Sequence, residues 1–126
     1  MIKPVYLFDS VILIDILNTK PQAKKWLSSV QEDRIAISVV TMSEVLVGTK
    51  DNEISVVMDA LGRLPCLPIV VSTAELAAKL RQQYRFKLLD AYQAALAIEH
   101  KLTLVTRNTK DFNPKIHPFV KIPYSL

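Results

Sequence analysis

The sequence has few of the residues that several common functional classes require. Its only two glycines, Gly48 and Gly62, exclude a glycine-rich phosphate-binding loop. Its single cysteine, Cys66, excludes an internal disulfide and favours a reducing, cytoplasmic location. No apolar stretch reaches the roughly 18 residues of a membrane-spanning helix. Asp9 and Asp15 interrupt the N-terminal apolar segment, so we expect neither a signal peptide nor a membrane association.

The composition suits one compact domain spanning residues 1–126. Half of the 126 residues are hydrophobic, which provides enough apolar surface for a sizeable core. Sixteen Lys and Arg residues against twelve Asp and Glu residues give a net charge of +4. If several acids gather in one pocket, the remaining surface is more basic than this total. A basic exterior around an acidic pocket suits a polyanionic substrate.

Short apolar segments alternate with helical ones along the chain. We predict strands at 5–8, 35–38, 68–71, 102–105 and 119–122. We predict helices at 12–17, 21–31, 41–47, 51–64, 72–84 and 91–100, with capping boxes at 41–44 and 72–75. This alternation predicts an α/β fold with a central, mostly parallel sheet of four to five strands that helices cover on both faces.

Four acidic residues are predicted to meet at one edge of this sheet. Asp9 ends the first strand, and Glu44 lies in the first turn of the helix after the second. Asp90 opens a helix that runs away from this edge, and the following strand returns towards it and leads to Asp111. Ligands of open α/β sheets bind at this carboxyl edge. All four carboxylates should therefore lie close together.

Clustered carboxylates repel one another, so something must neutralise them. Lysine or arginine could do so in a structural network. Mg²⁺ or Mn²⁺ could do so as well, because hard cations prefer oxygen ligands and retained water. Such ions activate water against a phosphate group, which makes phosphodiester hydrolysis the reaction that the pattern favours.

Four segments resemble PIN-domain ribonucleases, and specifically the VapC-type toxins of bacterial toxin–antitoxin pairs. They are Leu-Phe-Asp-Ser at 7–10, Ser-Glu-Val-Leu-Val-Gly at 43–48, Leu-Asp-Ala at 89–91 with Ala-Ala-Leu-Ala at 94–97, and Leu-Val-Thr-Arg-Asn-Thr-Lys-Asp-Phe at 104–112. The resemblance covers nearly the whole chain. It implies a three-layer α/β/α fold and an Mg²⁺-dependent endoribonuclease, with Mn²⁺ able to substitute. It also implies a cognate antitoxin and a homodimer.

The resemblance also assigns roles to residues of the acidic pocket. It implies that Asp9 and Asp90 are the main magnesium ligands, and that Glu44 and Asp111 complete the pocket directly or through water. Ser10 supplies the hydroxyl that such domains place after the first aspartate. These implied roles make all four acids candidate catalytic residues.

Further polar residues are implied, with one departure from the family pattern. Thr106 and Asn108 are implied to order the loop that carries Asp111. Val11 stands where the family usually has Asn or Ser, which removes a polar contact at the pocket rim.

Basic residues near the acids are the candidates for binding the RNA backbone. Arg107 and Lys110 flank the last acidic motif and are the better candidates for holding phosphate. Arg85 and Lys87, together with Lys79 and Arg81, form a cluster that is either a solvated helix face or a phosphate-contacting strip.

Structural roles remain open for several of these residues. Glu44 and Asp90 could act only as helix caps, and Asp111 could act only in a turn. Asp15 is expected to have a surface or salt-bridge role. His100 and His117 lack metal-ligand spacing, and we interpret both as non-catalytic.

Two other functional classes compete with the nuclease. One is an inactive PIN-like module that binds RNA or protein. The other is a receiver-type signalling domain with a magnesium-binding acidic pocket.

Overall fold

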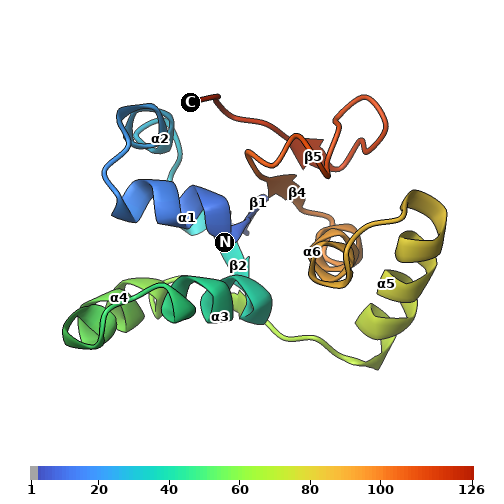
Figure 1. The fold of residues 1–126 in the computed structure, drawn as a ribbon, viewed down its shortest axis with the longest axis horizontal. Coiled ribbons are helices and arrows are strands. Elements are labelled where there is room, and N and C mark those ends of the chain that lie inside the picture. Colours follow the sequence, from blue (N-terminus) through green and yellow to red (C-terminus); the bar gives the residue numbers. More distant parts are fainter. Residues whose placement is uncertain (1–2) are drawn as a thin grey trace.

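The fold is built on a five-stranded sheet between two helical layers, in a computed structural model that describes residues 3–126 (Figure 1). The strands are β1 (Tyr6–Phe8), β2 (Ile35–Ser38), β3 (Cys66–Leu67), β4 (Thr103–Val105) and β5 (Val120–Lys121). Their order in the sheet is β3-β2-β1-β4-β5, and all four pairings are parallel. The central position of β1 places its end between the ends of β2 and β4.

Within the described residues, six α-helices surround the sheet. They are α1 (Ser10–Leu17), α2 (Pro21–Leu27), α3 (Val39–Val47), α4 (Ile54–Leu61), α5 (Val71–Tyr84) and α6 (Leu88–Glu99), with short 3₁₀ helices η1 (Glu32–Arg34) and η2 (Asp51–Glu53). In Figure 1, α1 to α4 lie on one side of the sheet and α5 and α6 on the other. No helix within residues 3–126 combines the length and apolar character needed to cross a membrane.

Successive side chains of the strands pack alternately into two separate hydrophobic cores. In β1, Leu7 packs in the core that α5 and α6 cover, and Phe8 packs in the core that α1, α3 and α4 cover. Leu104 and Val105 of β4 divide in the same way. This period-two division is what a sheet covered on both faces requires. The predicted three-layer α/β/α architecture is confirmed.

Small side chains bring α6 close to the sheet. Ala91, Ala94, Ala95 and Ala97 are fully buried, and alanine leaves room for neighbouring backbones to approach. The helix also has favourable intrinsic propensity because alanine loses no side-chain entropy on folding. This close approach places the start of α6 beside the end of β1.

The third strand differs from the prediction at 68–71. It forms instead at Cys66–Leu67 and pairs with Ile37 and Ser38 of β2. Val71 begins α5, and the backbone N–H of Val70 is bonded to the Thr73 hydroxyl at 3.3 Å. The β-branched run after Pro68 resembled a strand, but it ends in the residues that start a helix.

Several predicted helix limits were also wrong. The helix α3 starts at Val39, because the Ser38 side chain caps it by accepting from the Thr41 backbone N–H at 3.0 Å. The helix α6 starts at Leu88 rather than after Asp90. The helix α2 ends at Leu27, earlier than predicted. The predicted helix at 51–64 is divided into η2 (Asp51–Glu53) and α4 (Ile54–Leu61).

Candidate metal centre

Asp9 lies at the carboxyl edge of the two central strands. It follows β1 directly, and its backbone N–H donates to the carbonyl of Val105 in β4 at 2.9 Å. Its side chain caps α1 by accepting from the Ser10 N–H at 2.9 Å. Asp9 therefore acts as a helix cap, and this contact also fixes the carboxylate at the strand end.

Both oxygens of the Asp9 carboxylate accept hydrogen bonds. Besides Ser10, Oδ1 accepts from Gln93 Nε2 at 3.2 Å, and Oδ2 accepts from the Thr106 hydroxyl at 2.7 Å. The side chain is buried, with 7% of its surface exposed. These three hydrogen bonds fix the orientation of the Asp9 side chain at the strand end.

Gln93 is a buried polar residue that the sequence analysis did not identify. Its Nε2 also donates to the Thr41 hydroxyl at 2.7 Å, and its Oε1 accepts from the Ser38 hydroxyl at 2.5 Å. The Thr41 hydroxyl in turn donates to the Phe8 carbonyl at 3.1 Å. One glutamine of α6 thus connects β1, β2 and α3 behind the acidic pocket.

A sequence signal for Gln93 did exist. It lies three residues after Asp90 on an otherwise alanine-rich segment, so the two side chains lie on the same face of the helix. A lone amide on a buried helical face must find partners.

Asp90 differs from Asp9 in how its oxygens are satisfied. Its Oδ2 is buried and has no hydrogen-bond partner among the described residues. Burial raises the pKa of Asp90 to about 6, helped by the negative charges of Asp9 and Asp111 and by a side-chain hydrogen bond with Asp111, although Lys87 opposes this shift. An unpartnered buried carboxylate oxygen beside other acids is an observation that fits a cation ligand.

Glu44 faces the same acids from α3. Burial raises the pKa of Glu44, an interaction with Ser10 lowers it, and the charge of Asp9 raises it further. The helix begins five residues before Glu44, so the capping-box interpretation of this residue was wrong. Glu44 is therefore free to face the pocket.

Asp111 is held in place by its own loop. Its Oδ2 accepts from the Asn108 side-chain amide at 2.9 Å, and its backbone N–H donates to Asn108 Oδ1 at 3.3 Å. The Asn108 backbone N–H donates to the Thr106 hydroxyl at 3.1 Å. Lys87, whose side chain is 73% exposed, forms an ion pair with the partly buried Asp111 at 3.8 Å. Thr106 and Asn108 thus connect Asp9 to Asp111 through consecutive contacts.

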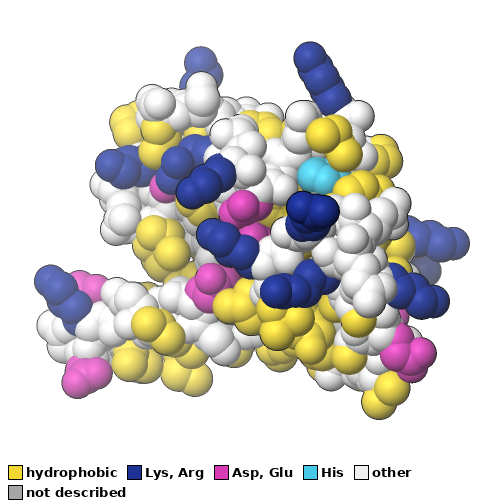
Figure 2. Space-filling view, turned by 45° about the vertical axis from the view of Figure 1, so that its right-hand side comes forward, with side chains coloured by type: hydrophobic (Ala, Val, Ile, Leu, Met, Phe, Trp, Pro, Cys, Tyr) yellow, Lys and Arg dark blue, Asp and Glu magenta, His cyan; other side chains and the backbone are white. Residues whose placement is uncertain are grey.

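Two adjoining hollows contain the four acids. A hollow of about 420 Å³ is lined by Asp9, Ser10, Val11, Glu44, Asp90, Arg107, Asn108, Thr109 and Lys110. A second, of about 350 Å³, is lined by Glu44, Lys87, Leu88, Leu89, Asp90, Asn108 and Asp111. On the face in Figure 2, acidic side chains lie near the centre with Lys and Arg side chains around them. The convergence predicted from strand order is present.

The chemistry of this donor set fits a hard divalent cation. The described residues contain no group of three His, Cys, Asp or Glu side chains already arranged to hold one ion. The carboxylates of Asp9, Glu44 and Asp90 nevertheless share one hollow, and Asp90 Oδ2 has no hydrogen-bond partner within residues 3–126. Oxygen donors with retained water are the set that Mg²⁺ and Mn²⁺ prefer.

The predicted phosphate-binding residues lie in different environments. Arg107 and Lys110 line the larger hollow, and Lys87 lines the smaller one. Arg85 is exposed at the end of α5 in a left-handed conformation (φ 60°) and lines neither hollow.

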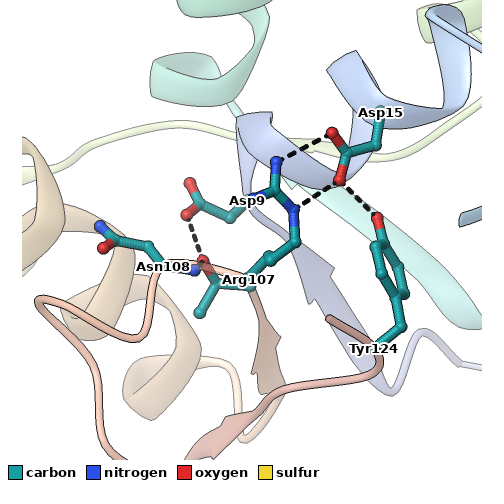
Figure 3. A network of polar contacts seen from close by, with 6 residues as sticks. Asp9, Asp15, Arg107, Asn108 and Tyr124 are labelled. Atoms are coloured by element: carbon teal, nitrogen blue, oxygen red, sulfur yellow. Dashed lines mark hydrogen bonds and ion pairs between the residues drawn. The ribbon is translucent and has the colours of Figure 1, made fainter. Parts of the chain in front are cut away.

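Arg107 is also paired with Asp15 of α1 (Figure 3). Its Nε and Nη2 donate to the two Asp15 oxygens at 2.8 and 3.0 Å. Tyr124, which the sequence analysis did not identify, donates its hydroxyl to Asp15 Oδ2 at 2.8 Å. The expected salt bridge of Asp15 is present, but the alternative surface position is wrong because the residue is 3% exposed.

His117 lies away from the acidic hollows, within a cluster of aromatic rings. Its ring packs against Tyr84, Phe86, Phe112 and Phe119, and its Nδ1 accepts from the Asn113 N–H at 3.0 Å. Burial lowers the pKa of His117. His100 is exposed at the end of α6.

Comparisons with known proteins agree with this geometry. The PIN domain family matches residues 6–113. A toxin–antitoxin complex from Klebsiella pneumoniae contains a chain that is 39% identical, with 96% of this chain and 99% of that chain covered and a TM-score of 0.89. FitAcB from Neisseria gonorrhoeae is 25% identical, with coverages of 86% and 91% and a TM-score of 0.71.

A more distant structure shares the fold. VapBC2 from Rickettsia felis, solved with a DNA fragment from its promoter, is 24% identical, with coverages of 97% and 98% and a TM-score of 0.76. No match to this chain is found among curated proteins. The strand order also differs from the 2-1-3-4-5 order of receiver domains, which removes that alternative. The chain belongs to the PIN-domain family, with the fold of the VapC-type members found in toxin–antitoxin complexes.

Proposed function

We propose that this PIN-domain protein is a metal-dependent endoribonuclease and the toxin of a toxin–antitoxin pair. The observation that carries the proposal is the meeting of four carboxylates from distant segments, with Asp90 Oδ2 buried and unpartnered. Family membership supports nuclease chemistry, and the 39% identity to a chain of a toxin–antitoxin complex supports the biological role. The proposed metal is Mg²⁺, with Mn²⁺ as a substitute.

The proposed roles follow from how each residue is held. Asp9 and Asp90 would hold the ion, and Glu44 and Asp111 would complete the carboxylate set. A bound divalent ion supplies a Lewis acid that lowers the pKa of water and offsets charge on the phosphate during hydrolysis. Ser10, Gln93 and Thr106 hold the Asp9 side chain in one orientation. Asn108 does the same for Asp111.

The charge distribution supports RNA as the substrate. Arg107 and Lys110 line the wall of the acidic hollow, and Lys87 lies beside Asp111. Basic groups at this position can hold the backbone on either side of the phosphate that reacts. We place this activity in the cytoplasm, where the RNA substrates are.

An apolar groove supports a protein partner. It has a volume of about 270 Å³ and is lined mainly by apolar residues of α1, α2 and α4 and the segments beside them, among them Leu13, Ile16, Leu27, Ala60 and Leu64. An amphipathic segment of an antitoxin encoded beside this chain is the occupant that we propose. A homodimer is part of the same proposal, by likeness to the family.

Expression of the chain in bacteria tests the enzymatic proposal. We expect growth arrest and discrete new RNA 5′ ends with the unmodified protein, and neither with Asp9→Asn. The matched control is Asp59→Asn, which changes an exposed aspartate of α4 and should behave as the unmodified protein. Equal cleavage by Asp9→Asn, or cleavage in a chelator, would contradict the proposal.

The main alternative is a PIN-like module that binds RNA without cutting it. Val11 at the pocket wall is the observation that favours it, because the family usually has a polar residue there. RNA binding by the purified protein with no metal-stimulated turnover would support this alternative instead.

A further inference from the structure

The pair between Arg107 and Asp15 joins the loop after β4 to the helix after β1. Asp15 is almost wholly buried, with 5% of its side chain exposed, whereas 30% of the Arg107 side chain is exposed. The two-pronged contact at 2.8 and 3.0 Å fixes the plane of the guanidinium. One end of the pair is therefore anchored in the protein, and the other end reaches the surface.

Arg107 also borders the candidate metal centre. Arg107 lines the same hollow as Asp9, Glu44 and Asp90. Figure 3 shows its guanidinium between the carboxylates of Asp9 and Asp15. Asp15 engages Nε and Nη2, which leaves the Nη1 edge of the guanidinium outside this pair.

Tyr124 completes the anchor from the C-terminal segment. Its hydroxyl donates to the same Asp15 oxygen that accepts from Arg107 Nε, at 2.8 Å. Tyr124 lies beyond residues 6–113, the part of the chain that the PIN domain family matches. Three segments, from α1, from the loop after β4 and from the end of the chain, thus fix one guanidinium.

A fixed guanidinium at this position has a specific use. The acidic hollow attracts a cation but repels an RNA backbone, so a positive group on its wall lowers that repulsion. Arginine binds phosphate through paired N–H donors, and a guanidinium that is already oriented loses less conformational entropy on binding. We infer that Asp15 and Tyr124 are positioning residues that hold Arg107 against a backbone phosphate of the RNA, an inference that rests on the proposed nuclease function.

The alternative is that the Arg107–Asp15 salt bridge only stabilises the loop. Its removal would then lower the stability of the protein but leave RNA affinity and the salt dependence of binding unchanged. A phosphate contact changes both, because each lost contact lowers the slope of log affinity against log salt by about 0.7 on single-stranded RNA.

RNA binding therefore distinguishes the two roles. The measurement is fluorescence anisotropy with a short, fluorescein-labelled single-stranded RNA across a salt series, in chelator and in an Asp90→Asn background that prevents cleavage. We expect Arg107→Gln to weaken binding about tenfold and to flatten the salt slope by about 0.7. The matched control, Arg63→Gln, changes an exposed arginine that lines neither acidic hollow and should leave the slope unchanged.

The anchor is tested by a double-mutant cycle. Asp15→Asn should weaken RNA binding severalfold, and its combination with Arg107→Gln should be no weaker than Arg107→Gln alone, because Asp15 acts through Arg107. Tyr124→Phe, a milder change that retains the ring, should shift affinity in the same direction by less. Melting temperatures of all variants separate these effects from unfolding.

Each result bears on a definite claim. Lower melting temperatures with unchanged RNA affinity and slope would overturn the positioning role and leave the nuclease proposal in place. Additive losses in the double mutant would also overturn it. Absence of both RNA binding and metal-stimulated cleavage in the unmodified protein would overturn the nuclease proposal and this inference together.

Discussion

At the scale of the residue, Asp9 and Asp90 share one hollow but have opposite hydrogen-bonding environments. Asp9 accepts three hydrogen bonds from Ser10, Gln93 and Thr106. Asp90 retains a buried oxygen without a partner, and burial together with its acidic neighbours raises its pKa to about 6. The protein thus satisfies both oxygens of Asp9, whereas one buried oxygen of Asp90 has no partner within residues 3–126.

This difference predicts a stability that falls as pH rises. An unfolded aspartate loses its proton near pH 3.8, whereas folded Asp90 retains it until about pH 6. Between these values the folded state binds more protons, so the free energy of unfolding decreases with pH. The free energy of unfolding decreases by at most about 3 kcal/mol over this pH range. In the absence of metal it stays at the lower value above about pH 6.

Asp90→Asn should remove this penalty. We expect the metal-free variant to be more stable than the unmodified protein at neutral pH and to lose this part of the pH dependence. Its RNA cleavage should fall by about a hundredfold or more, because one of the two proposed metal ligands is removed. Urea unfolding at several pH values, with Asp59→Asn as the control, measures the effect. A variant less stable than the parent at neutral pH would contradict it.

A second prediction concerns Gln93. Gln93→Glu keeps an acceptor for Ser38 but replaces the donor to Asp9 and Thr41 with a second carboxylate. Divalent metal affinity or activity should fall by about 10- to 100-fold. Metal titrations compare the metal affinity of Gln93→Glu with that of Gln82→Glu, which makes the same change at an exposed position of α5. Equal metal affinity in the two variants would show that Gln93 does not position Asp9.

At the scale of the element, the helices α5 and α6 are joined by a side-chain cap. Glu99 at the end of α6 accepts from the hydroxyls of Ser72 and Thr73 at 2.8 and 2.6 Å, in the first turn of α5. The Thr73 bond, followed by the Ser72 bond, lowers the pKa of Glu99. The stabilisation is therefore present above the usual glutamate pKa and is lost as pH falls through the lower folded value.

Glu99→Gln should destabilise the protein modestly without affecting the metal centre. The expected loss is about 1 kcal/mol or less, because the contact is partly solvated. Thermal unfolding at neutral pH compares it with Glu75→Gln, an exposed glutamate of α5. RNA cleavage at a temperature well below unfolding should be unchanged, and a loss of cleavage there would contradict the assignment.

The elements also show what sequence patterns can and cannot predict. The strands at β1, β2 and β4 are short apolar runs, and their positions followed closely from that pattern. The strand β3 did not, because the run after Pro68 is equally apolar and only its tertiary context makes Val71 helical. Strand pairing decides between two such runs, and pairing is not visible in local sequence.

The residues of the candidate site also include some that the sequence predicted and some that it did not. The four acids were predictable because parallel strands end at one edge. Tyr124 could not be identified, because its partner lies 109 residues away in the sequence. The spacing of Gln93 from Asp90 was a signal, but the partners of Gln93 lie 52 to 84 residues away and could not be named. The pairing of Arg107 with Asp15 was hidden for the same reason, because the two residues are 92 positions apart.

At the scale of the whole molecule, the acidic hollow and the apolar groove are separate surfaces. The groove lined by α1, α2 and α4 shares no residue with either acidic hollow. Ala60→Arg should fill this groove and weaken binding of the adjacent-gene antitoxin, while RNA cleavage by the isolated protein stays unchanged. Co-purification and a cleavage assay compare it with Ala78→Arg on α5, an exposed alanine outside the groove. Unchanged antitoxin binding by Ala60→Arg would place the partner elsewhere.

The central claim is that carboxylates from distant segments hold one kind of divalent cation. Calorimetric titration of Mn²⁺ into the metal-free protein at pH 6, in buffers of different ionisation enthalpy, tests it most directly. We predict saturable binding that releases protons, because burial and the neighbouring acids raise the pKa of Asp90 to about 6, and a large loss of affinity in Asp90→Asn. No saturable binding, or equal affinity in the unmodified protein and Asp90→Asn, would contradict the claim.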